Sequence, residues 1–358
     1  MNHADWPLSA PVNLTWEITH QCNLSCIHCL SSSGAETPGE LNLEECMSIV
    51  DQLAALRVFE INFGGGEPLL NSFFIPLLNY IHKKGIVTCI STNGTVLNDK
   101  AVACFADNPL VNIQVSLDGA TPEVNDKIRG KGTFRQIVNG IERLAKRDVP
   151  LSINTVVTSI NFEQLSQLKE LAGSFGARLR VSRFRPSGRG KGTWEKLKLN
   201  SWQLRELSDW LSHDHSILTG DSFFSISGED RRELGLNMCG ACKMTCCIDP
   251  CGSVYPCAFL QENEFCAGNL KETSFKEIWD SALIFQYFRK LEPTSCRKCS
   301  RFNMCQGGCP AVAYFVKKDL NSPDPECLIN WTMDVSDGLM SEREKIIVDK
   351  GQRYVRTI

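Results

Sequence analysis

Short β-branched runs alternate with amphipathic stretches over residues 12–186, and this alternation narrows the possible folds more than any other feature. Each stretch is long enough for a helix, so we expect neighbouring strands to be parallel and joined by right-handed crossovers. Six such units predict an α/β fold, a partial (β/α)6 TIM-like barrel that lacks two strands of the complete form. The predicted strands cover residues 14–19, 58–63, 86–91, 111–117, 152–157 and 179–183, and the predicted helices cover 42–56, 73–83, 99–105, 134–146 and 162–174.

Polar strings follow three of the predicted strands, at the edge where parallel sheets bind their ligands. GGGEP at residues 64–68 follows the second strand, STNG at 91–94 the third and SLDG at 116–119 the fourth. Glycine allows a backbone to approach a ligand closely, and the polar side chains can hydrogen-bond a ribose or a carboxylate. Each string also fits an ordinary turn, so the strings alone leave both interpretations open.

Three cysteines at C-x3-C-x2-C spacing, Cys22, Cys26 and Cys29, directly follow the first predicted strand. A [4Fe-4S] cluster takes four thiolates, so three leave one iron open to a small chelating molecule. A zinc site is an alternative that Cys46 and two nearby histidines keep open, and buried free thiols are another. Together with the strings downstream, the spacing favours iron–sulfur chemistry.

The three-cysteine motif and the GGGEP string resemble those of the radical S-adenosylmethionine (SAM) enzymes, whose open iron binds SAM and cleaves it reductively. The resemblance implies that Cys22, Cys26 and Cys29 are the catalytic cluster ligands, and His28 fills the aromatic position before the third cysteine. It also implies SAM contacts from the loop, the strand ends and the segment after the fourth strand: His28, Gly65, Gly66, Glu67, Ser91, Asn93, Ser116, Asp118, Arg129 and Asn154.

The second half of the chain carries an independent cysteine pattern. It reads C-x12-G-x4-C, then C-x2-C-x5-C-x3-C, then one further cysteine, and it resembles the SPASM domain, which houses two auxiliary [4Fe-4S] clusters. A zinc ribbon is the alternative for the cysteine pairs. By the resemblance, Cys296, Cys299, Cys305 and Cys327 hold one cluster, and Cys239, Cys257 and Cys309 hold the other; Cys246 is preferred as its fourth ligand over Cys242, Cys247 and Cys251, or the site is open.

Four further thiols, Cys46, Cys89, Cys104 and Cys266, are expected in the core. The two resemblances divide the chain into a radical SAM core at residues 1–215, a SPASM domain at 216–335 and a C-terminal tail at 336–358. The implied cofactors are three [4Fe-4S] clusters and SAM, with a flavodoxin- or ferredoxin-type protein as the reductant.

Composition argues against several other functions. The 358 residues include 18 cysteines and carry a formal net charge of −3 at pH 7. This charge gives no general attraction to nucleic acid, and the sequence shows neither a signal peptide nor a long uncharged apolar run. We therefore expect a cytoplasmic protein without a membrane segment, whose cysteines stay reduced.

A basic run at residues 178–198 contains eight Lys or Arg residues and one acid. Such a run is usually a solvated face. Arg183 and Arg185 lie at the exit of the sixth predicted strand, however, where side chains reach a barrel interior. We expect one of them to hold an anionic substrate group, such as a peptide carboxylate, by bidentate hydrogen bonds.

Several strings together resemble those of the mycofactocin radical SAM maturases: HCLSSSG at 28–34, RPSGRG at 185–190, LTGDSFF at 218–224, IDP at 248–250 and PDPEC at 323–327. The resemblance implies a small, ribosomally made precursor peptide that ends in Val-Tyr. It implies oxidative decarboxylation of this Tyr, followed by a carbon–carbon crosslink to the Val. The first cysteine motif begins at residue 22, so we expect a separate peptide-chaperone protein to recognise the leader.

Two other functions stay in competition. One is another SPASM maturase, from a tetrapyrrole or quinone-cofactor pathway. The other is a non-catalytic iron–sulfur scaffold, although a scaffold needs no SAM site. A formylglycine-forming role is disfavoured, because Ala258 follows Cys257 where the sulfatase-type maturases carry an Asp.

Overall fold

The computed structural model describes residues 8–219 and 239–328, and one nine-stranded sheet includes strands from both ranges. Its strand order is β6-β5-β4-β3-β2-β1-β7-β8-β9. The six parallel strands of the first range are β1 (Asn13–Thr19), β2 (Glu60–Gly65), β3 (Val87–Thr92), β4 (Val111–Ser116), β5 (Leu151–Val157) and β6 (Arg178–Arg183). The predicted partial (β/α)6 barrel is confirmed, with strand boundaries that differ from the predicted ones by at most two residues.

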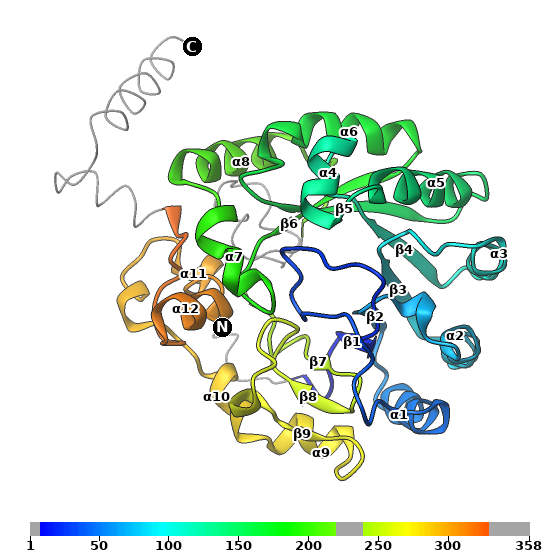
Figure 1. The fold of residues 1–358 in the computed structure, drawn as a ribbon. Helices are drawn as coiled ribbons and strands as arrows, with labels where there is room; N and C mark the ends of the chain where they lie inside the picture. The colour runs from blue at the N-terminus through cyan, green and yellow to red at the C-terminus, as the bar shows by residue number, and fades with distance from the viewer. Residues whose placement is uncertain (1–7, 220–238, 329–358) are drawn as a thin grey trace.

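Helices cover the outer face of this parallel sheet (Figure 1). The five that were predicted are α1 (Leu43–Ala55), α2 (Phe74–Lys83), α3 (Asp99–Ala106), α5 (Thr133–Ala145) and α6 (Leu165–Ser174), the last preceded by the short η3 (Phe162–Gln164). Asn42 and Glu45 fix the start of α1, because each side chain accepts a hydrogen bond from the other's backbone N–H, at 3.0 and 2.8 Å. This capping box satisfies two amide donors that the first helical turn leaves unpaired.

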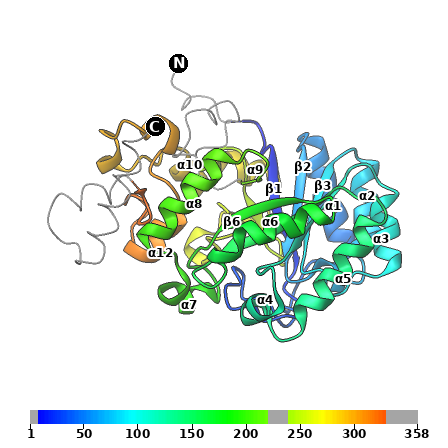
Figure 2. The same cartoon turned by 90° about the horizontal axis from the view of Figure 1, so that it is seen from above.

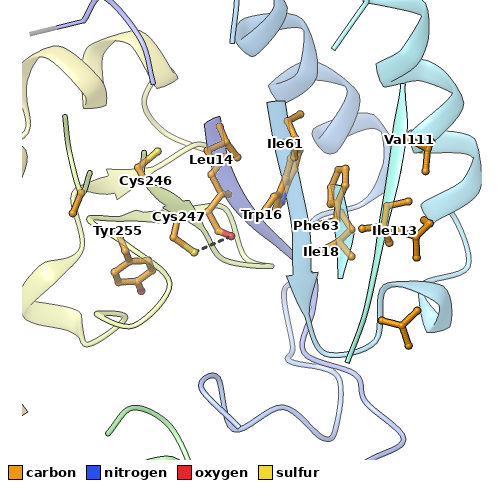
Figure 3. Packing of buried hydrophobic residues seen from close by; sticks show 14 of the residues in the cluster. Leu14, Trp16, Ile18, Ile61, Phe63, Val111, Ile113, Cys246, Cys247 and Tyr255 are labelled. Atoms are coloured by element: carbon orange, nitrogen blue, oxygen red, sulfur yellow. Dashed lines mark hydrogen bonds between the residues drawn. The ribbon is translucent and has the colours of Figure 1, made fainter. Parts of the chain in front are cut away.

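Alternation along the strands gives the sheet two different faces. On the helix side, the rings of Trp16 and Phe63 stack with centroids 5.8 Å apart, and Phe63 meets Phe74 edge-on at 5.2 Å. Figure 3 shows Trp16 and Phe63 with buried neighbours from β1, β2 and β4. The residues between them, such as Glu17 and Asn62, are polar and point to the barrel interior. Burial of the apolar face holds the sheet together, while the polar face remains for chemistry.

Three further helices of the first range were not predicted. These are α4 (Pro122–Arg129), α7 (Gly190–Leu197) and α8 (Ser201–His213). The α4 helix is short and mostly polar, so it lacks a clear apolar period, although Pro122 at its first position is a typical start signal. A short 3-10 turn, η2 (Pro68–Leu70), follows β2. The α4 helix matters for function, because it carries Arg129 at its end.

The C-terminal range extends the same sheet beyond β1. Strand β7 (Cys247–Ile248) pairs parallel with β1, and β8 (Ser253–Tyr255) and β9 (Gly268–Asn269) follow antiparallel. Asp249 shapes the turn between β7 and β8, because its Oδ1 accepts the backbone N–H groups of Cys251 and Ser253. The later elements are η6 (Asn263–Phe265), α9 (Phe275–Ser281), α10 (Leu283–Arg289), η7 (Thr294–Cys296), α11 (Phe302–Cys305) and α12 (Pro310–Lys317). Figure 2 shows α10 and α12 on the opposite side of the molecule from α2 and α3.

The predicted domain division stays a prediction. Its boundary at residue 215 falls just after α8, and the shared sheet joins the two parts. The boundary at 335, the tail at 336–358 and most of the LTGDSFF string lie outside the described residues. Within the described residues, no helix combines the length and the apolar character needed to cross a bilayer.

Candidate active site

The loop after β1 holds the three predicted catalytic cysteines, with Cys26 buried and Cys22 and Cys29 partly exposed. Burial raises the pKa of the Cys22 thiol, and the negative charges of Glu67 and Cys29 raise it further, so the thiols lie within electrostatic range of one another. The Leu24 backbone N–H and the Asn93 amide donate to the Cys22 sulfur, the latter at 3.9 Å.

Arg129 supplies a cation to this loop, because its guanidinium lies 3.9 Å from the Cys26 sulfur. Sulfurs that receive N–H donors and a buried cation suit iron–sulfur ligation, since hydrogen bonds to the ligands tune and stabilise a cluster. The residues therefore fit the group that the sequence implies.

The glycines after β2 fasten this loop to the sheet. The Gly66 N–H donates to the Thr19 carbonyl at 2.7 Å, and the Glu67 N–H donates to the Gln21 carbonyl at 2.8 Å. A Cβ on Gly66 would lie 2.0 Å from the Gln21 oxygen, and Gly65 has a φ of +100° that favours glycine. These residues are thus required by contact between two backbones, and their predicted contact with SAM stays a prediction.

Glu67 is completely buried next to this contact. Its carboxylate accepts hydrogen bonds from the Thr92 hydroxyl at 2.8 Å and from the Asn93 backbone N–H at 2.7 Å. Burial raises the pKa of Glu67 to about 7, although these donors oppose the shift. A fully buried carboxyl beside a ligand loop could receive a cationic group, and the amino group of SAM is one.

Asp118 joins His28 and Arg129 in a buried network. Its Oδ2 lies 2.9 Å from His28 Nε2 and 2.7 Å from Arg129 Nε, and its Oδ1 accepts the Val156 N–H at 2.8 Å. Burial opposes ionisation, but the charges of Arg129 and His28 hold the pKa of Asp118 well below its usual range. Asp118 therefore orients two predicted SAM contacts beside Cys26, while its own contact with the SAM ribose stays a prediction.

The other predicted contacts lie on the interior face of β3, β4 and β5. Ser91 accepts a hydrogen bond from Gln114 at 3.0 Å, and Asn154 accepts one from the Ser182 hydroxyl at 2.7 Å. Ser116 is the register partner of Asn154. The structure thus gathers these side chains at the carboxyl ends of neighbouring strands, where ligands of parallel sheets bind.

The RPSGRG string forms a brace for the cysteine loop, a role that the sequence analysis missed. Arg189 donates to the Cys26 carbonyl at 3.0 Å and to the Ser33 carbonyl at 2.8 Å. Gly188 has a φ of +51°, and a Cβ there would lie 2.3 Å from the Leu30 oxygen. The only signal in the sequence was the string itself, which the analysis used solely as a mark of resemblance.

The structure contradicts the expectation that Arg183 faces the barrel interior. Arg183 shares a strand face with Leu179 and Val181, which are core residues. Its guanidinium donates two hydrogen bonds to Asp324 at 2.6 Å and one to Glu326 at 2.5 Å. These carboxylates already occupy the group that was expected to bind a substrate carboxylate.

The two groups of C-terminal cysteines stay a prediction. Burial raises the pKa of Cys257 to about 12, and the charges of Cys239 and Cys309 raise it further. Burial also raises the pKa of Cys305 to about 12, and the charges of Cys327 and Cys296 add to it. Cys296 in turn is affected by Cys327 and Cys299. Backbone N–H groups of Ala241, Phe259 and Gly307 donate to Cys239, Cys257 and Cys305, as at Cys22.

The remaining thiols differ in their surroundings. Cys46 is fully buried in the core, as expected, and burial raises its pKa to about 12. Cys89 and Cys104 are partly buried. Cys266 is exposed, so its predicted place in the core is wrong; a residue next to a short turn does not need to pack.

Two family models match the chain: the radical SAM superfamily over residues 16–172 and an iron–sulfur cluster-binding domain, SPASM, over residues 239–300. Mycofactocin maturase MftC of Mycolicibacterium smegmatis is 43% identical over 332 residues, which cover 90% of this chain and 84% of that protein. The AdoMet-dependent heme synthase of Methanosarcina barkeri is 30% identical over 345 residues, which cover 89% of this chain and 97% of that protein. The crystal structure of Streptococcus suis SuiB bound to precursor peptide SuiA has the same fold, with a TM-score of 0.76 at 21% identity over 90% of this chain and 76% of that one.

Proposed function

The chain belongs to the mycofactocin maturase family of radical SAM enzymes, and on that premise we propose that it modifies the C-terminal Val-Tyr of a small precursor peptide. The coarser function follows from the family: it is a SAM-dependent, iron–sulfur, peptide-modifying enzyme. The proposed reaction is oxidative decarboxylation of the Tyr, followed by a carbon–carbon crosslink to the Val. Fold likeness alone does not determine a substrate, so the peptide must be tested directly.

One observation carries the proposal for the core site. The loop of Cys22, Cys26 and Cys29 is fastened to the ends of β2, β3 and β4, where the polar interior face of the sheet terminates. When bound, the core cluster would supply the electron for reductive cleavage of SAM. The three thiolates would hold this cluster and leave one iron open for SAM.

The protein's own residues would orient SAM. Glu67 is placed to hold the amino group of SAM, because Thr92 and Asn93 fix its carboxylate. Asp118 holds Arg129 beside Cys26, where the guanidinium can receive the SAM carboxylate. Ser91, Ser116 and Asn154 offer hydroxyl and amide groups at the strand ends.

The C-terminal cysteines support two auxiliary [4Fe-4S] clusters and hence three in all. For the cluster at Cys239, Cys257 and Cys309, we assign the fourth position to Cys242 in place of Cys246. Cys242 is fully buried in a turn with a φ of +61°, and this turn is closed by its N–H to the Thr245 carbonyl at 2.8 Å. Burial raises the pKa of the Cys242 thiol, and the charges of Cys246, Cys239 and Cys257 raise it further. Burial also raises the pKa of Cys246, against the lowering effect of Arg289, without a contribution from Cys239 or Cys257.

The backbone around Cys242 supports this choice. Arg289 donates to the Cys242 carbonyl at 2.8 Å and so holds the turn from outside. A strained backbone at a buried cysteine is typical of a position that the surrounding structure keeps for function.

Iron counting tests the cluster assignment. Reconstituted protein should contain about twelve irons, as three four-iron clusters require. Cys242→Ala should lower the iron content or convert one auxiliary cluster to a three-iron form visible by EPR after oxidation, whereas Cys246→Ala, the matched control, should not. About four irons, or stoichiometric zinc, would refute the model of three clusters.

Peptide assays test the substrate. A precursor peptide ending in Val-Tyr, supplied with its peptide-chaperone and a flavodoxin- or ferredoxin-type reductant, should lose one carbon dioxide and then gain the crosslink. The same peptide ending in Val-Ala is the control and should give only uncoupled SAM cleavage. Conversion of a tetrapyrrole but not of the peptide would instead support the heme synthase type of reaction.

A further inference from the structure

The end of β6 and the segment after α12 meet in a buried group of charges. Arg183, Asp324 and Glu326 have side chains that are 3, 2 and 8% exposed. Arg183 donates to both oxygens of Asp324 at 2.6 Å and to Glu326 at 2.5 Å. One cation therefore faces two carboxylates in a region without solvent, and we call these three residues the Arg183 network.

Asp324 also holds the backbone of two cysteines. Its Oδ2 accepts the Cys309 N–H at 2.8 Å, and its carbonyl accepts the Cys327 N–H at 3.0 Å. The proposed function assigns these cysteines to different auxiliary clusters, so one aspartate is attached to a ligand of each. Gly308 makes this approach possible, because a Cβ there would lie 2.4 Å from Asp324 Cβ.

The charges of the network lie next to both cysteine groups, because Asp324 is hydrogen-bonded to the backbone of Cys309 and of Cys327 and its carboxylate is paired with Arg183. A buried charge near a cluster changes the energy of adding an electron, and solvent screens it little. Removing the Arg183 cation leaves Asp324 with its backbone N–H donors alone and Glu326 with only the charge of Arg185, and this gain of net negative charge disfavours a reduced, more negative cluster.

We propose that the Arg183 network is a positioning device that ties the sixth barrel strand to one ligand of each auxiliary cluster and sets the reduction potentials of both. The inference rests on the proposed function, because it takes Cys309 and Cys327 as cluster ligands. Through these contacts, a displacement of β6 would alter the surroundings of the cysteines that are proposed to bind the auxiliary clusters. Arg183 touches neither substrate nor cofactor in this assignment and acts through Asp324.

The experiment uses the full chain with Cys22, Cys26 and Cys29 changed to Ala, so that only auxiliary clusters remain. Iron content and an EPR-monitored redox titration are measured for Arg183→Gln, Arg183→Lys and Asp324→Asn in this background. We expect Arg183→Gln to move at least one auxiliary cluster to a lower potential and Asp324→Asn to move it higher. Arg183→Lys should restore most of the shift, because it keeps the charge.

Arg178→Gln is the matched control, since Arg178 is exposed at the other end of β6 and loses the same charge. It should leave both potentials unchanged. Unshifted potentials in both Arg183→Gln and Asp324→Asn would overturn the inference, and so would equal shifts in Arg178→Gln. If Arg183→Gln does not fold, the opposite shift in Asp324→Asn decides. Absence of auxiliary iron in the background variant itself would refute the proposed function instead.

Discussion

The two cysteine regions of the molecule each contain a buried Arg–Asp pair, but the balance of charge differs. In the core, Asp118 is shared by Arg129 and His28, so one carboxylate faces two potential cations beside Cys26. In the C-terminal part, Arg183 is shared by Asp324 and Glu326, so one cation faces two carboxylates beside Cys309. The Asp118 network is thus better suited than the Arg183 network to accept a further negative charge.

The two regions also differ in how their cysteines are held. The core loop is fixed at its backbone, by hydrogen bonds from the Gly66 N–H to the Thr19 carbonyl and from the Arg189 side chain to the Cys26 carbonyl. In the C-terminal part, the charged side chain of Asp324 accepts the backbone N–H of Cys309. A loop that must bind and release SAM benefits from a preformed backbone frame, because ordering it again in each turnover would cost conformational entropy.

Removing one cysteine from each region should separate the two roles most strongly. Cys26→Ala should abolish SAM cleavage, since the core cluster loses a ligand. Cys305→Ala should retain uncoupled cleavage but lose peptide modification, because its cluster is proposed to handle electrons from the peptide. Deoxyadenosine and modified peptide are measured side by side under dithionite, with and without peptide. Full peptide turnover by Cys305→Ala would remove the proposed role of that cluster.

Breaking the core ion pair should have the next largest effect. Arg129→Met leaves Asp118 buried and ionised without its main partner, which should cost about 3 to 5 kcal/mol of unfolding free energy. Arg143→Met is the matched control, because Arg143 and Asp99 form an exposed pair with side chains 49 and 91% exposed. Loss of an exposed pair should cost at most about 1 kcal/mol. Urea unfolding of the apoprotein measures the loss of unfolding free energy in both variants. Equal losses would show that the burial of the Arg129–Asp118 pair does not add to its contribution.

The fold was largely predictable from the sequence, because the six βα units have long, regular patterns. The short strands β7, β8 and β9 could not be predicted, because two or three residues are too few to show a periodic pattern of apolar side chains. Their place in the sheet depends on pairing with β1, a contact more than two hundred residues away in the chain. Local patterns do not encode such a contact.

The resemblance to radical SAM enzymes pointed to Glu67 and Asp118, and the structure shows both carboxylates completely buried near the cysteine loop, while their contacts with SAM stay a prediction. Arg183 was misplaced, because a single residue at a strand end decides which face it joins. Its partners Asp324 and Glu326 lie in the PDPEC string, in which only Cys327 had an assigned role. Only the three-dimensional structure shows that Arg183 contacts Asp324 and Glu326.

Glu67 offers a pH test of the core site. Its folded pKa of about 7 lies above its ordinary value of 4.5, so the folded state binds the proton more tightly than the unfolded state. This contribution to stability is complete below about pH 4.5 and is lost as pH rises towards 7, amounting to roughly 3 kcal/mol. Glu67→Gln should flatten the fall in stability over this range, measured by urea unfolding of the apoprotein.

Glu44→Gln is the control for that measurement, because Glu44 is exposed on α1. It should leave the pH dependence as in the unmodified protein. If the free energy of unfolding of Glu67→Gln falls with pH as steeply as that of the unmodified protein, the pKa of Glu67 is not raised in the folded state. The auxiliary region provides the contrast, since Asp324 has a lowered pKa despite burial, owing to Arg183 and its N–H donors.

Replacing one glycine by alanine in each region is the smallest change that should distinguish the two regions. Gly66→Ala places a Cβ against the Gln21 oxygen, and Gly308→Ala places one against Asp324 at a φ of +85°. Each should cost about 1 to 3 kcal/mol, as overpacking does. The first should lower iron at the core cluster alone, and the second should lower auxiliary iron alone. Gly64→Ala is the control, because the space beside Gly64 is open. Iron counts and EPR spectra measure the outcome; loss of the same cluster in both variants would show that the regions do not assemble independently.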